Sequence, residues 1–169
     1  MRAHSYVDIQ MSALLDRFIP TPDRGKRHGT LVRAPADLVL DVARNFDLQA
    51  APLVRVIFWL RNKILRAKDP LPGRGMGLVA LTRSIGWGVL VDEPGAYVSG
   101  ATCQPWEADV SFCAIPAEQF ATSYTPDRVK IVWSLEAEAI EPGLTRLCTE
   151  TRIVATDESA RSRFRRYWR

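Results

Sequence analysis

Apolar and polar residues alternate along two adjacent segments in the second half of the chain. In VKIVWSLEAEAI, residues 129–140, apolar side chains occupy the odd positions, and the even positions include a lysine, a serine and two glutamates. In LTRLCTETRIVA, residues 144–155, three charged side chains occupy even positions. A period of two is typical of a β-strand, so the pattern predicts an antiparallel hairpin with one dry face and one solvated face.

The same pattern predicts how the two strands pair. A three-residue EPG turn pairs Ile140 with Leu144, which sets Trp133 opposite Thr151. On the solvated face, Glu138 then meets Arg146, and Ala137 meets Leu147 on the dry one. A loop one residue shorter or longer would set each apolar side chain opposite a charged one. We also expect Glu150 on the solvated face, paired with a neighbouring charge.

A helical pattern follows directly on the second strand. On a helical wheel, Ala160, Phe164, Tyr167 and Trp168 fall on one side, and the arginines fall on or beyond its edge. Thr156 or Asp157 supplies the N-cap. This pattern predicts a closing amphipathic helix on the dry face of the sheet. The alternative that it leaves open is a basic arm for nucleic acid.

The first half of the chain mixes strand and helix signals. Residues 8–17 suit a short helix, RHGTLVR (27–33) a strand, and PLVRVIFWLRNKILR (52–66) a helix. A further helix opens at Pro35, with Leu38, Val42 and Phe46 four residues apart.

From residue 78 onward we expect extended structure. LVALTRSIGWGVLV and AYVSGATCQ flank a DEPG turn, and ADVSFCAI is a further strand. PAEQFATSY suits one or two helical turns.

Composition and charge narrow the function classes. The chain has 169 residues, 47% of them hydrophobic, and a net charge of +4. Five arginines against two acids in residues 157–169 contribute +3 of that charge. The rest is near neutral, so we expect no nucleic-acid partner. No apolar run reaches membrane-spanning length, and no secretory signal or CxxC pair is visible among three cysteines. A cytoplasmic protein with reduced thiols is expected.

Sites for catalysis are sparse. The two histidines, His4 and His28, provide no rich metal site and no nucleophile–base–acid set. Phosphate-binding and dinucleotide-binding glycine motifs are absent from the sequence. We therefore expect no catalytic residue, metal or cofactor. His28 stays open as a lone general base, although a structural role suits it better.

Three segments together resemble the START-like, or SRPBCC, superfamily: HGTLVRAPADLVLDVA, GVLVDEPGAYVSGATCQPW and TETRIVATDESARSRFRRYW. The resemblance implies an α+β helix-grip fold, in which a curved antiparallel sheet wraps a C-terminal helix and two short helices follow the first strand. It divides the chain into an N-terminal extension (1–26) and a helix-grip domain (27–169). The family's closing helix runs on past FRRYWR, so the chain departs from the pattern there.

The resemblance also implies a cavity for apolar molecules between the sheet and the closing helix. Arg61 lies within a broad apolar sector of helix 52–66, where it would bind a ligand carboxylate or phosphate, pair with an internal acid, or extend to water. For the other residues predicted to line the cavity, the alternative role is packing in the hydrophobic core. The predicted lining residues are Leu31, Arg61, Trp87, Phe112, Trp133, Leu135, Phe164 and Trp168.

The predicted function is the binding, transport or sequestration of an apolar small molecule or lipid. One alternative is a cyclase- or dehydratase-like enzyme that uses the same cavity. Another is a protein- or membrane-interaction module without a small ligand, since helix 52–66 is basic and apolar and carries Trp59 on its polar side. Transient contact with a membrane is compatible with both the ligand-binding hypothesis and the interaction-module hypothesis. The oligomeric state is left open.

Overall fold

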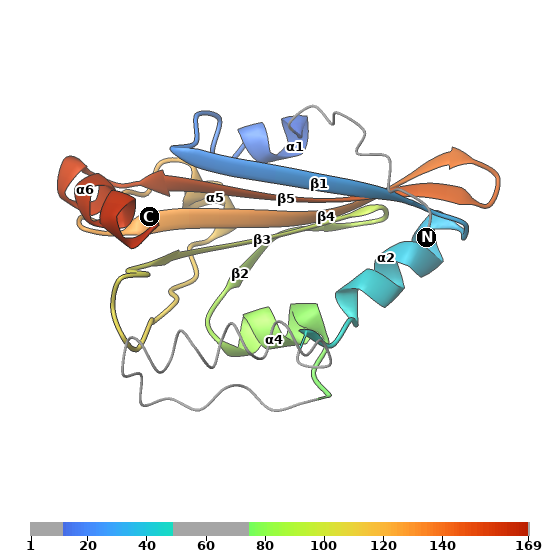
Figure 1. Cartoon of the computed structure of the whole chain (residues 1–169), viewed down its shortest axis with the longest axis horizontal. Coiled ribbons are helices and arrows are strands. Elements are labelled where there is room, and N and C mark those ends of the chain that lie inside the picture. Colours follow the sequence, from blue (N-terminus) through green and yellow to red (C-terminus); the bar gives the residue numbers. More distant parts are fainter. Residues whose placement is uncertain (1–11, 49–74, 169) are drawn as a thin grey trace.

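A computed structural model describes residues 12–48 and 75–168, which form the expected α+β fold (Figure 1). Five antiparallel strands lie in the order β1-β5-β4-β3-β2, so β1 and β2 are the edges of the described sheet. The elements are α1 (Ala13–Asp16), β1 (Arg24–Val32), α2 (Ala36–Arg44), α4 (Leu78–Ser84), β2 (Gly88–Glu93), β3 (Ala96–Cys103), α5 (Ala117–Phe120), β4 (Val129–Glu141), β5 (Leu144–Ala155) and α6 (Glu158–Tyr167). The predicted helix 52–66, and Arg61 with it, lies outside the described residues.

The central hairpin has the predicted pairing but a different turn. Trp133 pairs with Thr151, Ala137 with Leu147 and Glu138 with Arg146. At the turn, however, Glu141 and not Ile140 pairs with Leu144, and the register shifts between Ala139 and Glu141. A two-residue turn with Gly143 at φ 75° therefore joins the strands, and the extra residue Ile140 restores the predicted register.

Both faces of the sheet are covered along most of its length, so the prediction of a solvated face is wrong there. Near the hairpin turn, Glu138 and Arg146 reach solvent as predicted. We call the side with the even-numbered residues of β4 and β5 the α1 face, and the opposite side the α2 face. On the α1 face, Leu15 of α1 and Phe18, which follows that helix, pack with Phe120 of α5 against Val132. Glu150, expected in water, is fully buried on this face. Figure 1 shows α1 on one side of the sheet and α2 and α4 on the other.

Helix α6 is amphipathic as predicted but packs differently. Ala160 and Phe164 are buried, whereas Tyr167 and Trp168, expected to face inward, are exposed. The helix lies by one end of the strands (Figure 1). Its buried side packs against residues near the ends of three strands, namely Cys103, Val129, Ile153 and Ala155.

The extended structure expected from residue 78 begins only at residue 88. Residues 78–84 form α4, in which Leu81 and Thr82 are buried and the Thr82 hydroxyl donates to Leu78 O at 3.1 Å. Gly86, at φ 99°, separates this helix from β2. The apolar run thus contains a helix and a strand, and Gly86 marks the break.

Four other predicted segments can be compared with the structure. The predicted strand ADVSFCAI makes only one bridge, between Thr102 and Cys113. The DEPG turn and the short helix in PAEQFATSY are confirmed, by the β2–β3 hairpin and by α5. Of the predicted helix 8–17, α1 is the helical part among the described residues.

Candidate ligand-binding groove

The apolar stripe of α2 is largely exposed. Val39 and Leu40 are buried and hold the helix on the sheet. Leu38, Val42 and Phe46, the residues that defined the stripe in the sequence, are each about half exposed. Large apolar side chains that recur on one exposed helix face indicate a binding surface more often than scattered single residues do.

This stripe forms one wall of a groove of about 420 Å³ on the α2 face. The volume lies within the roughly 300–1,000 Å³ common for small-molecule sites. Every lining residue within the described part of the chain is apolar. They come from the end of β1, from α2, from the start of α4 and from β4 and β5: Val32, Ala34, Leu38, Val39, Val42, Ala43, Phe46, Leu78, Leu135 and Leu147.

The close approach of α2 and α4 helps to shape this groove. Gly77, at the N-cap of α4, lies so near the end of α2 that an added Cβ would come within 2.9 Å of Asn45 Cα. Glycine therefore permits the two helix ends to meet, and Leu78 follows at once to line the groove. Leu135 and Leu147 contribute from the two neighbouring central strands.

Of the eight residues predicted to line a cavity, Leu135 lines this groove. Trp133 is buried in the adjacent cluster, where its ring centroid lies 5.6 Å from that of Tyr97. Trp87 and Phe112 stack on each other, with centroids 5.3 Å apart, away from the groove.

Three further predicted residues lie elsewhere. Phe164 is buried beneath α6, whereas Leu31 and Trp168 are exposed at the surface. Arg61 lies outside the described residues. The sequence reasoning missed Leu38, Val42, Phe46 and Leu147 as lining residues, although it identified the first three as an apolar stripe.

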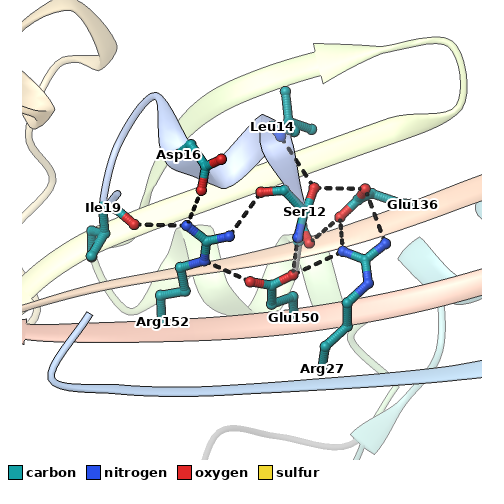
Figure 2. Close-up of polar contacts among 9 residues, drawn as sticks. Ser12, Leu14, Asp16, Ile19, Arg27, Glu136, Glu150 and Arg152 are labelled. Carbon is teal, nitrogen blue, oxygen red and sulfur yellow. Dashed lines mark hydrogen bonds and ion pairs between the residues drawn. The ribbon is translucent and has the colours of Figure 1, made fainter. Parts of the chain in front are cut away.

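A second feature, on the α1 face, is a buried network of charged residues (Figure 2). Glu150 accepts hydrogen bonds from Ser12 N at 2.7 Å, from Arg27 Nη1 at 2.8 Å and from Arg152 Nε at 2.6 Å. Glu136 accepts from Ser12 Oγ at 2.9 Å and from Arg27 Nη1 at 3.1 Å. Each buried charge in the network has charged or hydrogen-bonding partners, and these contacts offset the free-energy cost of removing the charges from water.

Arg152 connects this network to the segment around α1. Its side chain is 1% exposed. Besides Glu150, it donates to Asp16 Oδ1 at 2.6 Å, to Ile19 O at 2.8 Å and to Ser12 O at 2.8 Å (Figure 2). These contacts explain the burial of Glu150: Glu150 and Arg152 face partners from the N-terminal segment rather than water. We assign this network a structural role.

Lys130 is a further buried cation on the α1 face. Its Nζ donates to Phe120 O at 2.7 Å and to Ala121 O at 3.1 Å, and lies 3.9 Å from the centre of the Tyr124 ring. Burial lowers the pKa of Lys130 from 10.5 to about 8.

The lowered pKa predicts a pH dependence of stability. Between pH 8 and 10.5 the unfolded chain binds more protons at Lys130 than the folded one, so the free energy of unfolding rises with pH, by about 1 kcal/mol per unit. Below pH 8, Lys130 is charged in both the folded and the unfolded chain, so the burial of its charge lowers the free energy of unfolding by the full amount. Urea unfolding at pH 8, 9 and 10 should show this rise in the wild type and in the exposed control Lys26→Met, and a smaller rise in Lys130→Met. An equal rise in all three proteins would contradict the assignment.

Three further observations concern chemistry and the membrane. His28 is exposed on the edge strand β1, opposite Thr149. In residues 12–48 and 75–168, no three His, Cys, Asp or Glu side chains are grouped so as to hold a metal ion. Across the same residues, no helix has both the length and the apolar character to cross a membrane.

Comparisons with known proteins give no family. No family model and no curated protein matches the chain. Among solved structures, the chain is similar to a hypothetical protein of Helicobacter pylori, with 8% sequence identity and a TM-score of 0.38. The match covers 94% of this chain and 85% of that one. Similarity at this level identifies neither a family nor a function.

Proposed function

We propose that this protein is a START-like helix-grip domain that binds an apolar small molecule or lipid in the groove beside α2. The observation that carries the proposal is a groove of about 420 Å³ whose lining, over the residues that the structure describes, is entirely apolar. Leu38 and Val42 expose large side chains on one face of α2, and Phe46 does so just beyond the C-terminal end of that helix. Removing such surface from water is favourable, and a bound apolar molecule would do so.

The order of the elements supports the helix-grip part of the proposal. The first strand pairs with the last, two described helices lie between β1 and β2, and a helix follows the last strand. One departure concerns α6, which packs near the strand ends (Figure 1). For that reason we place the ligand beside α2 rather than beneath the closing helix.

A matched pair of leucine variants tests the site. Leu38 and Leu31 are each 53% exposed, but only Leu38 is among the groove residues. Leu38→Glu sets a carboxylate in the groove and should weaken binding of the neutral fluorescent probe N-phenyl-1-naphthylamine at least about tenfold, since the ligand would desolvate the charge. Leu31→Glu should leave probe affinity unchanged. Both variants should stay within about 1 kcal/mol of wild-type stability, because both side chains are exposed.

The possible outcomes separate the hypotheses. Loss of binding in Leu38→Glu alone supports the groove. Loss in Leu31→Glu alone would contradict the groove and place the site beside Leu31 of β1, which the sequence analysis predicted to line the cavity. No probe binding by the folded wild type would contradict the proposal and favour the interaction-module alternative.

A further inference from the structure

Polar side chains of β1 and β5 border the groove on the α2 face. Thr30 is the cross-strand partner of Leu147, which lines the groove. Thr149 is the cross-strand partner of Leu135, another lining residue, and on its other side it pairs with His28. Directly opposed residues point to the same face of a sheet, with their Cβ atoms about 4.5–5.5 Å apart. The apolar lining therefore continues directly into a row of hydroxyl and imidazole groups.

Lys26 extends this polar border by one further position on β1. It alternates with His28 and with the groove residue Val32, so its side chain lies on the α2 face, and it pairs with Thr151. Lys26 and His28 are exposed, and neither side chain makes a hydrogen bond or an ion pair within residues 12–48 and 75–168. Thr151 lies two positions beyond Thr149, about 7 Å along the strand. A ligand head group that leaves the groove past Thr149 would therefore meet the ammonium group of Lys26.

Charge is distributed unequally between the two faces of the sheet. On the α2 face, the charged side chains from the described residues of β1, β4 and β5 are Arg24 and Lys26, and none of them is acidic. Asp37 and Asp41 of α2 line a separate hollow, not the groove. An anion beside Lys26 would thus be attracted without repulsion from the sheet. The glutamates in the paired parts of β4 and β5 lie on the α1 face and pair with arginines: Glu136, Glu138 and Glu150.

We infer that the ligand of this groove is an apolar chain that ends in a carboxylate, with the chain beside α2 and the carboxylate at Thr149, His28 and Lys26. This inference rests on the proposed function and specifies its ligand class. A carboxylate accepts from a hydroxyl, an imidazole N–H and an ammonium group, which are the donors present. One lysine suits a monoanion, whereas phosphate is favoured by the two-pronged guanidinium of arginine. Arg24 lies farther from the groove, opposite Ile153, and its Nη1 donates to Asp23 O at 3.1 Å.

Decanoate and decan-1-ol have the same chain and differ in the head group, so together they test this inference. Each is titrated into protein with labelled methyl groups while the signals of Val42 and Leu147, which line the groove, are followed by NMR. We expect both probes to shift these signals in the wild type. In Lys26→Glu, the ratio of the decanoate Kd to the decan-1-ol Kd should rise about threefold to tenfold, because a repulsion replaces an attraction at an exposed site.

Arg17→Glu is the matched control. Arg17 is exposed at the end of α1, on the opposite face of the sheet, and its reversal changes the net charge by the same amount. The ratio of the two Kd values should stay at its wild-type value in this variant. An equal rise in Lys26→Glu and Arg17→Glu would mean that net charge alone sets the ratio, and would overturn the carboxylate site.

The orientation of bound decanoate gives a second readout. A filtered NOE experiment should place its C2 methylene beside the Thr149 methyl group and its terminal methyl beside Val42. The reverse orientation, or an unchanged ratio in Lys26→Glu with both probes bound in the groove, would overturn the carboxylate inference and leave the proposed function standing. If neither probe shifts the groove methyl signals of the wild type, both are overturned.

Discussion

Replacing Arg152 with methionine is expected to lower the free energy of unfolding by about 3–5 kcal/mol. The variant keeps an apolar side chain of similar length but leaves the carboxylate of Glu150, which is 0% exposed, without its closest charged partner at 2.6 Å. It also removes the donor to Ser12 O and Ile19 O, which tie the segment around α1 to the sheet. Urea unfolding monitored by circular dichroism measures the change.

The same strand supplies the control. Arg146 lies on the same face of β5 and pairs with the cross-strand Glu138 at 2.9 Å, but both side chains reach solvent. Arg146→Met should therefore cost less than about 1 kcal/mol. Equal effects of the two variants would show that Arg152 is not buried in a charge network. Adding Glu150→Gln to Arg152→Met should recover part of the loss, because the stranded charge is then gone.

Replacing Phe164 with aspartate is expected to destabilise the protein by about 3–5 kcal/mol. Phe164 is buried between α6 and the strand ends, where it packs with Val129, Ile153 and Ala155. The change empties that position and sets a charge in it. Thermal and urea unfolding measure the effect.

Trp168, on the same side of the wheel, is the matched control. Its side chain is 57% exposed, so Trp168→Asp should change stability by less than about 1 kcal/mol. Reversing the exposed Arg165 and Arg166 to glutamate should have a similarly small effect. A large loss in Trp168→Asp would mean that α6 extends across the sheet, as the sequence analysis expected.

The register of the central hairpin is predictable because the alternation of apolar and polar residues requires odd-numbered residues of one strand to pair with odd-numbered residues of the other. Trp133 has to face Thr151 if apolar residues are to share a side. The turn itself is not predictable in this way. A three-residue loop, and a two-residue turn with Ile140 as an extra residue, give identical pairing for the rest of the hairpin.

The burial of the charged face could not be read from the strands. Glutamate and arginine at alternate positions have the same pattern whether they meet water or one another. Here the partners of Glu150 and Arg152 include Ser12 and Asp16, which lie more than 130 residues away in sequence. A periodicity contains no information about contacts over such distances.

The candidate site was predictable only in part. Leu135 was identified as a lining residue, and the α2 stripe was recognised as an amphipathic face. A helical wheel gives the direction of Leu38, Val42 and Trp168 but not whether a sheet lies opposite them. The sequence therefore overestimated the burial of both helix faces.

The central claim, that the groove beside α2 holds an apolar molecule, is tested most directly by a filtered NOE experiment. Protein with labelled leucine and valine methyl groups would be mixed with unlabelled N-phenyl-1-naphthylamine. The account predicts cross-peaks from the probe to the methyl groups of Leu38, Val42 and Leu147, which line the groove. Cross-peaks confined to Leu31, or to Leu15 on the α1 face, would contradict it.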